Sequence, residues 1–448
     1  MHMTWPLMAV MLLTVAFVIG VGIFQSRKVR SAEGYSVGGR SAGVPMVAGG
    51  IAGTVGTAQL AYSVGLSAWW FTLGSGIAFI LMGIFYAQKM RSTGLSTIPQ
   101  FLGMHYGRRA ERLSSVISSI GILLSAVASC LPGMEIISSI FGVGELPAAI
   151  ILMTLVAAYT FFGGMKSAAI GGILKMAVIW LSLFVCGFEA YEVLASSSVA
   201  IPPSHLDLFG RGFEVSMSNL FSMIVGVLCT QTYIQCIFSA DTPITAAAGC
   251  ITAALIVIPV GLPSVAVGMY MSAFDPNVVP VLTLPTYFTN HASFLVGGLA
   301  MGGIVLSLIS SIGGLSLGIG TMLVTDILMP ILHLQDDKAL LRLTKISVLS
   351  VMAAACVIAA MNRGTQVLFW NYLSMGLRGG GIFLPLTLSV FFPEHLKRGW
   401  AVLSMAGSTV AAILAVVLHL PIDSLFAGLI VSVLLILPGL RLKKVDGE

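Results

Sequence analysis

A cluster of serines interrupts a long apolar run in the second half of this sequence. The stretch LSLISSIGGLS places Ser307, Ser310 and Ser311 within about two turns of a helix. A lone serine in a membrane helix usually bonds to the carbonyl of the preceding turn and has no further role. Three close serines, followed by Gly313 and Gly314, weaken that explanation. The stretch predicts a polar site in an apolar helix, with glycines that allow a neighbour to approach closely.

A second candidate site is the glycine-rich stretch GGIAGTVGTAQLAY, residues 49–62. The pair Gly49 and Gly53 fits the small-residue pattern of a helix packing face. Alternatively, the helix unwinds midway and frees carbonyl oxygens that bind a cation. The spacing alone leaves both interpretations open.

A third stretch, CTQTYIQCIFSAD, places Gln231 and Gln235 four residues apart. That spacing puts both amides on one helix face. They either bond to a neighbouring helix or contact a solute, and the sequence does not separate these alternatives.

Ionisable side chains inside a bilayer are costly and usually mark a function or a pair. Arg378, in SMGLRGGGIFLP, is the clearest case, and a structural pair with Glu135 is one alternative for it. Lys175 follows AAIGGIL near the cytoplasmic start of a predicted span. For Lys175 the sequence favours a side chain that reaches back to the lipid headgroups.

The composition shows which elements must position these residues. Of the 448 residues, 57% are hydrophobic and only 9% are charged, whereas ordinary soluble domains carry about 25% charged residues. The mean hydropathy is +1.01. Long apolar runs recur along the chain, and a helix needs about 20 such residues to cross a bilayer. The sequence therefore predicts an all-α integral membrane protein embedded in the lipid bilayer.

About thirteen transmembrane helices are predicted, and basic residues orient them. If the N-terminus lies outside the cell, the cytoplasmic loops hold 19 of the 22 Lys and Arg residues. The C-terminus is then cytoplasmic, and the short loops suit a bacterial inner membrane. The predicted spans are 3–24, 44–64, 66–88, 113–141, 146–163, 168–194, 217–240, 246–272, 295–325, 343–361, 365–391, 400–420 and 423–440.

Several function classes are excluded or disfavoured. There is no Gly-Lys dipeptide, so no nucleotide-binding P-loop exists and an ATP-driven pump on this chain is disfavoured. No His-x-x-x-His or cysteine cluster indicates a haem or metal enzyme. The net charge of +5 reflects the loops rather than a nucleic-acid partner. No enzyme activity, catalytic residue, cofactor or obligate protein partner is predicted.

The motifs, in their order, resemble the sodium:solute symporter family. They are GGRS (38–41), GTAQLAYSVGLSAWW (56–70), TIPQFLGMHYGRR (97–109), YTFFGGMKS (159–167), QTYIQCIFSAD (231–241) and SLISSIGGLSLGIGTMLVTDI (307–327). The resemblance implies a LeuT-type fold in which spans 2–6 (44–194) and 7–11 (217–391) form two inverted five-helix repeats. The span 3–24 precedes them and two C-terminal spans (400–440) follow, in a single transporter domain.

The resemblance also implies a sodium site between the second and ninth spans. The matching ligands here are the hydroxyls of Ser310 and Ser311 and the carbonyls of Ser307, Gly53 and Gly56, with Ala52 and Val55 as register alternatives. The chain departs from the family after the fifth span. Gly172 stands where the family usually carries Asp, and Lys175 stands where it carries Gln.

The pocket positions that match the family are Gln59, Ser222, Met223, Gly226, Asn371 and Tyr372. The seventh span lacks the aromatic that sugar carriers use, and Arg378 would favour a carboxylate, so an amino acid or carboxylate is expected rather than a sugar. The resulting prediction is sodium-coupled symport of a small organic solute. Proton-coupled or exchange transport through Lys175 is one alternative, and a membrane sensor that binds solute without moving it is another.

Overall fold

The computed structural model describes residues 3–26, 31–51, 56–199, 201–333, 335–362, 365 and 367–440, and within this part it is almost entirely helical. The α-helices are α1 (Trp5–Ser26), α2 (Ala32–Val37), α3 (Val44–Ile51), α4 (Gly56–Val64), α5 (Trp69–Leu81), α6 (Gln88–Ser92), α7 (Ile98–Tyr106), α8 (Arg108–Phe141), α9 (Glu145–Ser196), α10 (Pro203–Leu206), α11 (Phe213–Leu228), α12 (Gln231–Ser239), α13 (Pro243–Phe274), α14 (Thr283–Asn290), α15 (Phe294–Met322), α16 (Met329–Leu332), α17 (Asp337–Met361), α18 (Val367–Phe391), α19 (Arg398–Val417) and α20 (Ser424–Ile436). Short 3-10 or π segments are η1 (Gly38–Arg40), η2 (Gly65–Ala68), η3 (Met82–Ala87), η4 (Pro280–Leu282), η5 (Leu323–Leu328) and η6 (Leu437–Gly439).

The predicted all-α membrane fold is confirmed. Nine helices of the described part are long and apolar enough to cross a bilayer, and the bent pair α11 and α12 makes up to ten. Two shorter apolar helices cover 145–160 and 424–439. The count of thirteen spans and the repeat boundaries at 44–194 and 217–391 stay predictions.

Two spans are interrupted in ways that matter for a site. Helices α11 and α12 are bent by 47° across Cys229 and Thr230. Helix α9 contains a break at Gly164, with φ 51° and ψ −141°. A Cβ at this glycine would lie 2.3 Å from the Tyr35 carbonyl oxygen, so only glycine fits there.

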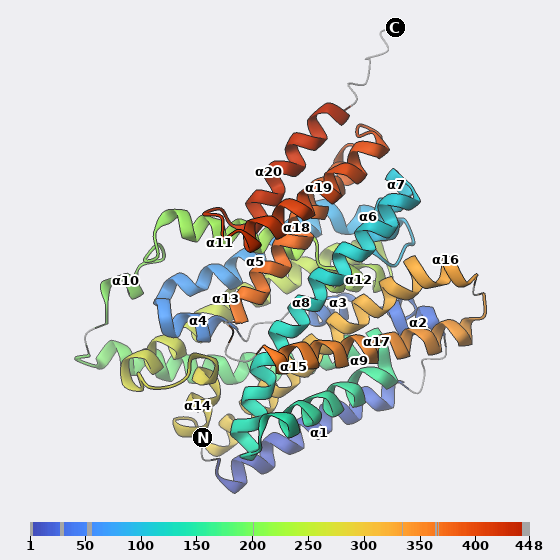
Figure 1. Ribbon diagram of the computed structural model, residues 1–448. Coiled ribbons are helices and arrows are strands. Elements are labelled where there is room, and N and C mark those ends of the chain that lie inside the picture. Colours follow the sequence, from blue (N-terminus) through green and yellow to red (C-terminus); the bar gives the residue numbers. More distant parts are fainter. Residues whose placement is uncertain are drawn as a thin grey trace.

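Helix α15 lies at the centre of the molecule. Of its most apolar window, 72% is buried, compared with 28% for α1. Helix α15 packs against α9, α1, α8 and α17, while α18, α19 and α20 group together on the other side, toward the C-terminus (Figure 1). Helix α1 exposes Leu13 and Phe17, which is the apolar surface expected to face lipid.

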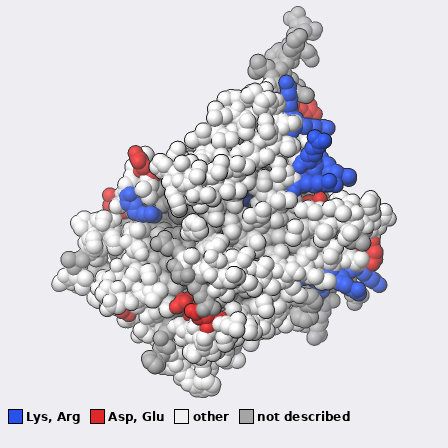
Figure 2. Space-filling view, viewed as in Figure 1, with Lys and Arg blue, Asp and Glu red and all other residues white. Residues whose placement is uncertain are grey.

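Charged residues gather at the margins of the molecule. Figure 2 shows Lys and Arg concentrated along one edge, near α7 and near the α16–α17 turn of Figure 1. Most of the face between the margins carries neither sign. This distribution leaves a broad uncharged belt of the kind that a bilayer covers.

Candidate functional site

A polar cavity of about 260 Å³ lies where the broken helices meet α15. Its lining comes from α4, α5, α8, α9, α11, α12, α15 and α18. Irregular backbone inside a bilayer persists only where it is buried in protein or lines a cavity. The break between α11 and α12 meets this condition, because Gly226, Thr230 and Tyr233 all line the cavity.

Backbone groups at the cavity are freed from their usual helical bonds. Thr230 lies in the break and donates its hydroxyl to the Gly226 carbonyl at 2.6 Å. Pro132 of α8 also lines the cavity, and its missing N–H leaves the Ala128 carbonyl without the usual helical donor. Both features add polar backbone to a pocket whose side chains are partly polar and partly apolar.

The three serines of α15 line this cavity together. The Ser310 hydroxyl lies 3.1 Å from the Ser307 carbonyl oxygen, to which it donates. Gly56, at the start of α4, also contributes to the lining. Ala52, Gly53 and Val55, the remaining predicted cation ligands, lie outside the described residues.

Lys175 of α9 reaches into the same group of oxygens. Its ammonium donates to the Ser310 hydroxyl at 2.5 Å, and the side chain is only 6% exposed. The expectation that Lys175 reaches the lipid headgroups is therefore wrong. The chain places a lysine amine against one of the hydroxyls predicted to bind sodium.

The paired glycines explain how α15 comes so close to its neighbours. A Cβ at Gly313 would lie 2.3 Å from the Thr160 hydroxyl of α9. At Gly314, it would lie 3.2 Å from the Thr232 methyl of α12, whose hydroxyl donates to the Gly314 carbonyl at 3.3 Å. Larger residues at these positions would separate the serines from the broken helix.

Arg378 of α18 is the second cation at the cavity. It is 4% exposed, and its Nε and Nη1 have no hydrogen-bond partner among the described residues. Glu135, its suggested partner, is exposed on α8, and no ion pair joins the two in the part of the chain that is described.

Other predicted pocket residues divide into two groups. Met223, Gly226 and Asn371 line the cavity. Gln59 of α4 and Ser222 of α11 are not among the lining residues, although Ser222 is buried with an unpaired hydroxyl. The side chain of Tyr372 lies outside the described residues.

The two glutamines of α12 bond to neighbouring segments. Gln231 accepts from the Ile98 N–H at 2.8 Å and donates to the Ser96 carbonyl at 3.0 Å. Gln235 donates to the Ser36 carbonyl at 2.5 Å and to the Thr321 hydroxyl at 3.1 Å. These contacts account for both amides and fix the inner end of the broken helix.

Ser125 and Ser129 of α8 are cavity residues that the sequence alone did not single out. They lie four residues apart on one helix face, and that spacing was the available signal. Ser125 pairs with Ser374 of α18 at 2.7 Å, which ties the two helices together beside Arg378.

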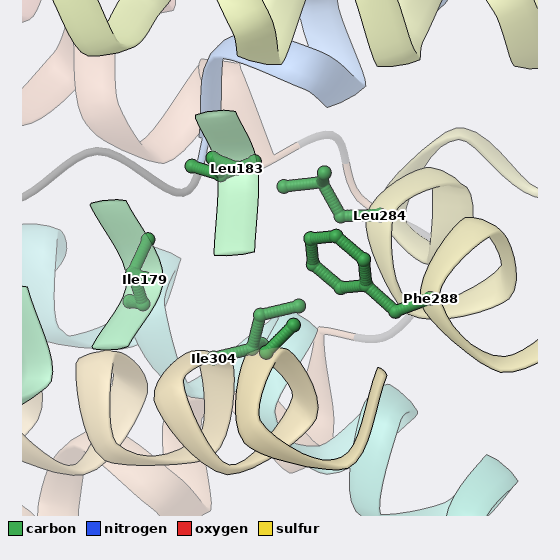
Figure 3. A pocket seen from close by; sticks show the side chains of 6 residues that line it. Ile179, Leu183, Leu284, Phe288 and Ile304 are labelled. Carbon is green, nitrogen blue, oxygen red and sulfur yellow. The ribbon is translucent and has the colours of Figure 1, made fainter. Parts of the chain in front are cut away.

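A second hollow in the described structure is lined by apolar side chains alone. It measures about 10 Å³ and is lined by Ile179, Leu183, Leu284, Phe288, Ala300 and Ile304. Figure 3 shows these apolar side chains pointing toward one another between α9, α14 and α15. This hollow is a packing gap.

Comparisons with known proteins match this architecture. The chain is 26% identical to the sodium/proline symporter of Staphylococcus aureus, over 92% of this chain and 88% of that protein. It is 24% identical to high-affinity choline transporter 1 of Caenorhabditis elegans, over 91% of this chain and 77% of that protein.

Among solved structures, a substrate-bound, outward-open Na⁺-coupled sialic acid symporter shares the fold. The TM-score is 0.80 at 17% identity, and the match covers 97% of each chain. A manganese transporter of Eremococcus coleocola is more distant, with a TM-score of 0.53 at 12% identity over 91% of this chain and 92% of that one. The predicted LeuT-type fold is thereby confirmed.

The model of the sodium:solute symporter family matches residues 32–407, which is most of the chain. The order of the motifs, the broken helix and the central cavity agree with that match. The chain belongs to the sodium:solute symporter family.

Proposed function

We propose that this chain carries a small organic solute through the central cavity by alternating access, in symport with sodium. The observation that supports this most directly is one cavity shared by the α11–α12 break and the serines of α15. Family membership supports a transporter rather than an enzyme, and it supports sodium as the coupling ion.

In this proposal, the Ser310 and Ser311 hydroxyls and the Ser307 carbonyl provide part of the sodium site. Gly56 and the neighbouring backbone of the second span provide the rest. The solute occupies the adjoining space beside Met223, Gly226 and Asn371. Ion and solute can shift the protein between outward- and inward-open states only through their different affinities for those states.

We also propose that the N-terminus faces outward, the C-terminus faces the cytoplasm, and the protein resides in a bacterial inner membrane. The concentration of basic residues along one edge supports a cytoplasmic margin there (Figure 2). A bacterial relative, the Staphylococcus aureus protein, supports the location.

The test is solute uptake by proteoliposomes, with an inward sodium gradient or an equal potassium gradient. Sodium should accelerate uptake, and Ser310→Ala should remove most of that acceleration. Ser389→Ala is the matched control, because Ser389 is a buried serine of α18 that bonds within its own helix and does not line the cavity. Equal uptake in both gradients would exclude sodium coupling, and solute binding without uptake would indicate a sensor.

A second coupling mode is favoured by one observation, the 2.5 Å contact between the Lys175 ammonium and Ser310. An ammonium that occupies a sodium ligand can replace the ion, so gain and loss of its proton would drive the cycle. Among the described lining residues, the other titratable groups are Tyr233, Cys236 and Arg378. This mode predicts sodium-independent uptake whose pH profile changes in Lys175→Gln; an unchanged profile would rule it out.

A further inference from the structure

We propose that the transported solute is a carboxylate without an ammonium group, and that Arg378 binds its carboxylate. This inference rests on the proposed transport function and specifies its substrate class. It is carried by a buried guanidinium with two unpaired nitrogens, at a cavity whose described lining residues include no Asp or Glu.

The guanidinium of Arg378 lacks the partners that a buried charge needs. It is 4% exposed, and its Nε and Nη1 are without hydrogen-bond partners in the described structure. Buried charges are normally paired, because an unpaired one is strongly destabilising. The planar guanidinium fork matches the two oxygens of a carboxylate, so a bound acid would bring the counter-charge that the described lining residues do not supply.

The stem of Arg378 is held in place by α8. A Cβ at Gly121 would lie 3.3 Å from the Arg378 Cβ and 3.3 Å from the Ser374 carbonyl oxygen. The Ser374 hydroxyl also donates to the Gly121 carbonyl and pairs with Ser125. The position of the arginine at the cavity is therefore fixed by close helix packing before any solute binds.

The charges around the cavity disfavour a solute that carries its own cation. Lys175 and Arg378 line the cavity, and none of its described lining residues is Asp or Glu. Of the described acidic residues, Asp326 alone has a buried side chain, and it accepts hydrogen bonds from Thr97 and Thr325. An ammonium in the cavity would meet two like charges and no counter-charge.

This chemistry separates the chain from the relatives named above. Choline is a cation and proline is a zwitterion, and each has a positive group for which the described lining offers no acidic side chain. From the sequence, either an amino acid or a carboxylate is expected. Of these two classes, the proposal retains the carboxylate without an ammonium group.

The other residues that line the cavity indicate the size and polarity of the rest of the solute. Phe71, Met165, Met223, Leu308 and Met375 supply an apolar lining. The cavity volume is about 260 Å³, which suits a small solute. A small monocarboxylate with an apolar body fits both features.

The test uses probes that share one carbon skeleton. Hexanoate, hexanamide and norleucine present a carboxylate, a neutral isostere and a zwitterion; benzoate and benzamide repeat the comparison with a ring. Each is titrated into the purified protein in sodium-containing buffer while the thermal midpoint is followed. We expect the acids to bind at least about tenfold more tightly than their amides, and norleucine to bind no better than hexanamide.

Substitutions test whether Arg378 is the residue that causes the preference for acids over amides. Arg378→Gln should weaken acid binding by roughly 10- to 100-fold, the range expected for lost hydrogen bonds to a charged group. It should leave amide binding unchanged, while Arg378→Lys should retain part of the preference. Arg109→Gln is the control, because it removes an exposed arginine outside the cavity. Gly121→Ala moves the arginine stem and should lower the acid-to-amide ratio without changing any charge.

The same probes separate the possible failures. Radiolabelled hexanoate and benzoate are also measured in proteoliposome counterflow. Acid binding without counterflow would refute transport and leave the assigned carboxylate site intact. Counterflow or binding that favours an amide or norleucine, no binding by either acid, or an unchanged acid-to-amide ratio in Arg378→Gln would overturn the carboxylate proposal.

Discussion

Replacing Lys175 with glutamine is expected to make this protein bind sodium much more tightly. The ammonium of Lys175 donates to the Ser310 hydroxyl at 2.5 Å, so it uses an oxygen that sodium would also need. Glutamine keeps a polar side chain of similar length and removes the charge. It is also the residue that the resemblance to the family implies at this position.

The magnitude follows from Coulomb's law. Two cations that share the Ser310 oxygen lie about 4 Å apart, and at an effective dielectric constant of about 20 they repel by about 4 kcal/mol. Each 1.4 kcal/mol is a factor of about ten in affinity, so the upper limit is roughly 1,000-fold. Movement of the ammonium away from Ser310 relieves part of this repulsion, and we expect a gain between about 10-fold and 1,000-fold.

The assay is a sodium titration of purified protein at constant ionic strength, with potassium as the balancing ion and the thermal midpoint as the readout. Lys89→Gln is the matched control. Lys89 donates to the Val390 carbonyl at 3.0 Å, outside the cavity, so its loss should leave the sodium affinity unchanged.

Sodium affinity that stays constant or falls in Lys175→Gln would refute the reasoning, provided that the variant without sodium melts near the unsubstituted protein. The ammonium would then support the site instead of competing for it. A gain of equal size in Lys89→Gln would also refute it, since the effect would reflect overall charge.

Three further predictions concern the packing that builds the site. The thermal midpoint of the purified protein checks the first two, and the yield of folded protein checks the third. Gln231→Ala leaves the buried Ile98 N–H without its acceptor, so it should cost about 1–3 kcal/mol while sodium affinity is retained. Gly313→Ala places a methyl 2.3 Å from the Thr160 hydroxyl, and this overpacking should lower the free energy of unfolding by about 1–3 kcal/mol. Adding Thr160→Ala should restore part of that stability. Additive losses in the double variant would contradict this. Gly164→Ala combines a positive φ with a Cβ 2.3 Å from the Tyr35 carbonyl, so it should yield far less folded protein than Gly142→Ala, whose positive φ opens onto free space.

The fold could be predicted from the sequence because its signals are local. Apolar runs identify membrane helices, and the order of short motifs identifies the architecture. The break between α11 and α12 is also marked by two residues near it in the sequence, Gly226 and Thr230. The Thr230 hydroxyl donates a hydrogen bond to the Gly226 carbonyl. The break in α9 depends on Gly164, whose φ lies in the region that glycine tolerates.

The chemistry of the site could be predicted only in part, because it depends on contacts between distant residues. Lys175 and Ser310 are separated by 135 positions, and no local pattern shows that one side chain reaches the other. The position of Lys175 along its span predicted a side chain that reaches the lipid headgroups. In the folded protein the side chain is instead buried and contacts Ser310. For Gln231 and Gln235 the reverse holds, since their contacts with Ile98 and Ser36 make them structural.

The solute class and the coupling ion are one physical question in this protein. Lys175, Arg378 and the α15 serines line a single cavity, so a charge bound at one point changes the affinity at the others. A carboxylate at Arg378 lowers the local positive potential and thereby favours a cation at Ser310. By linkage, sodium must favour the carboxylate by the same factor. A neutral solute would gain no such charge coupling, so the two buried cations favour an anion as the solute that sodium accompanies.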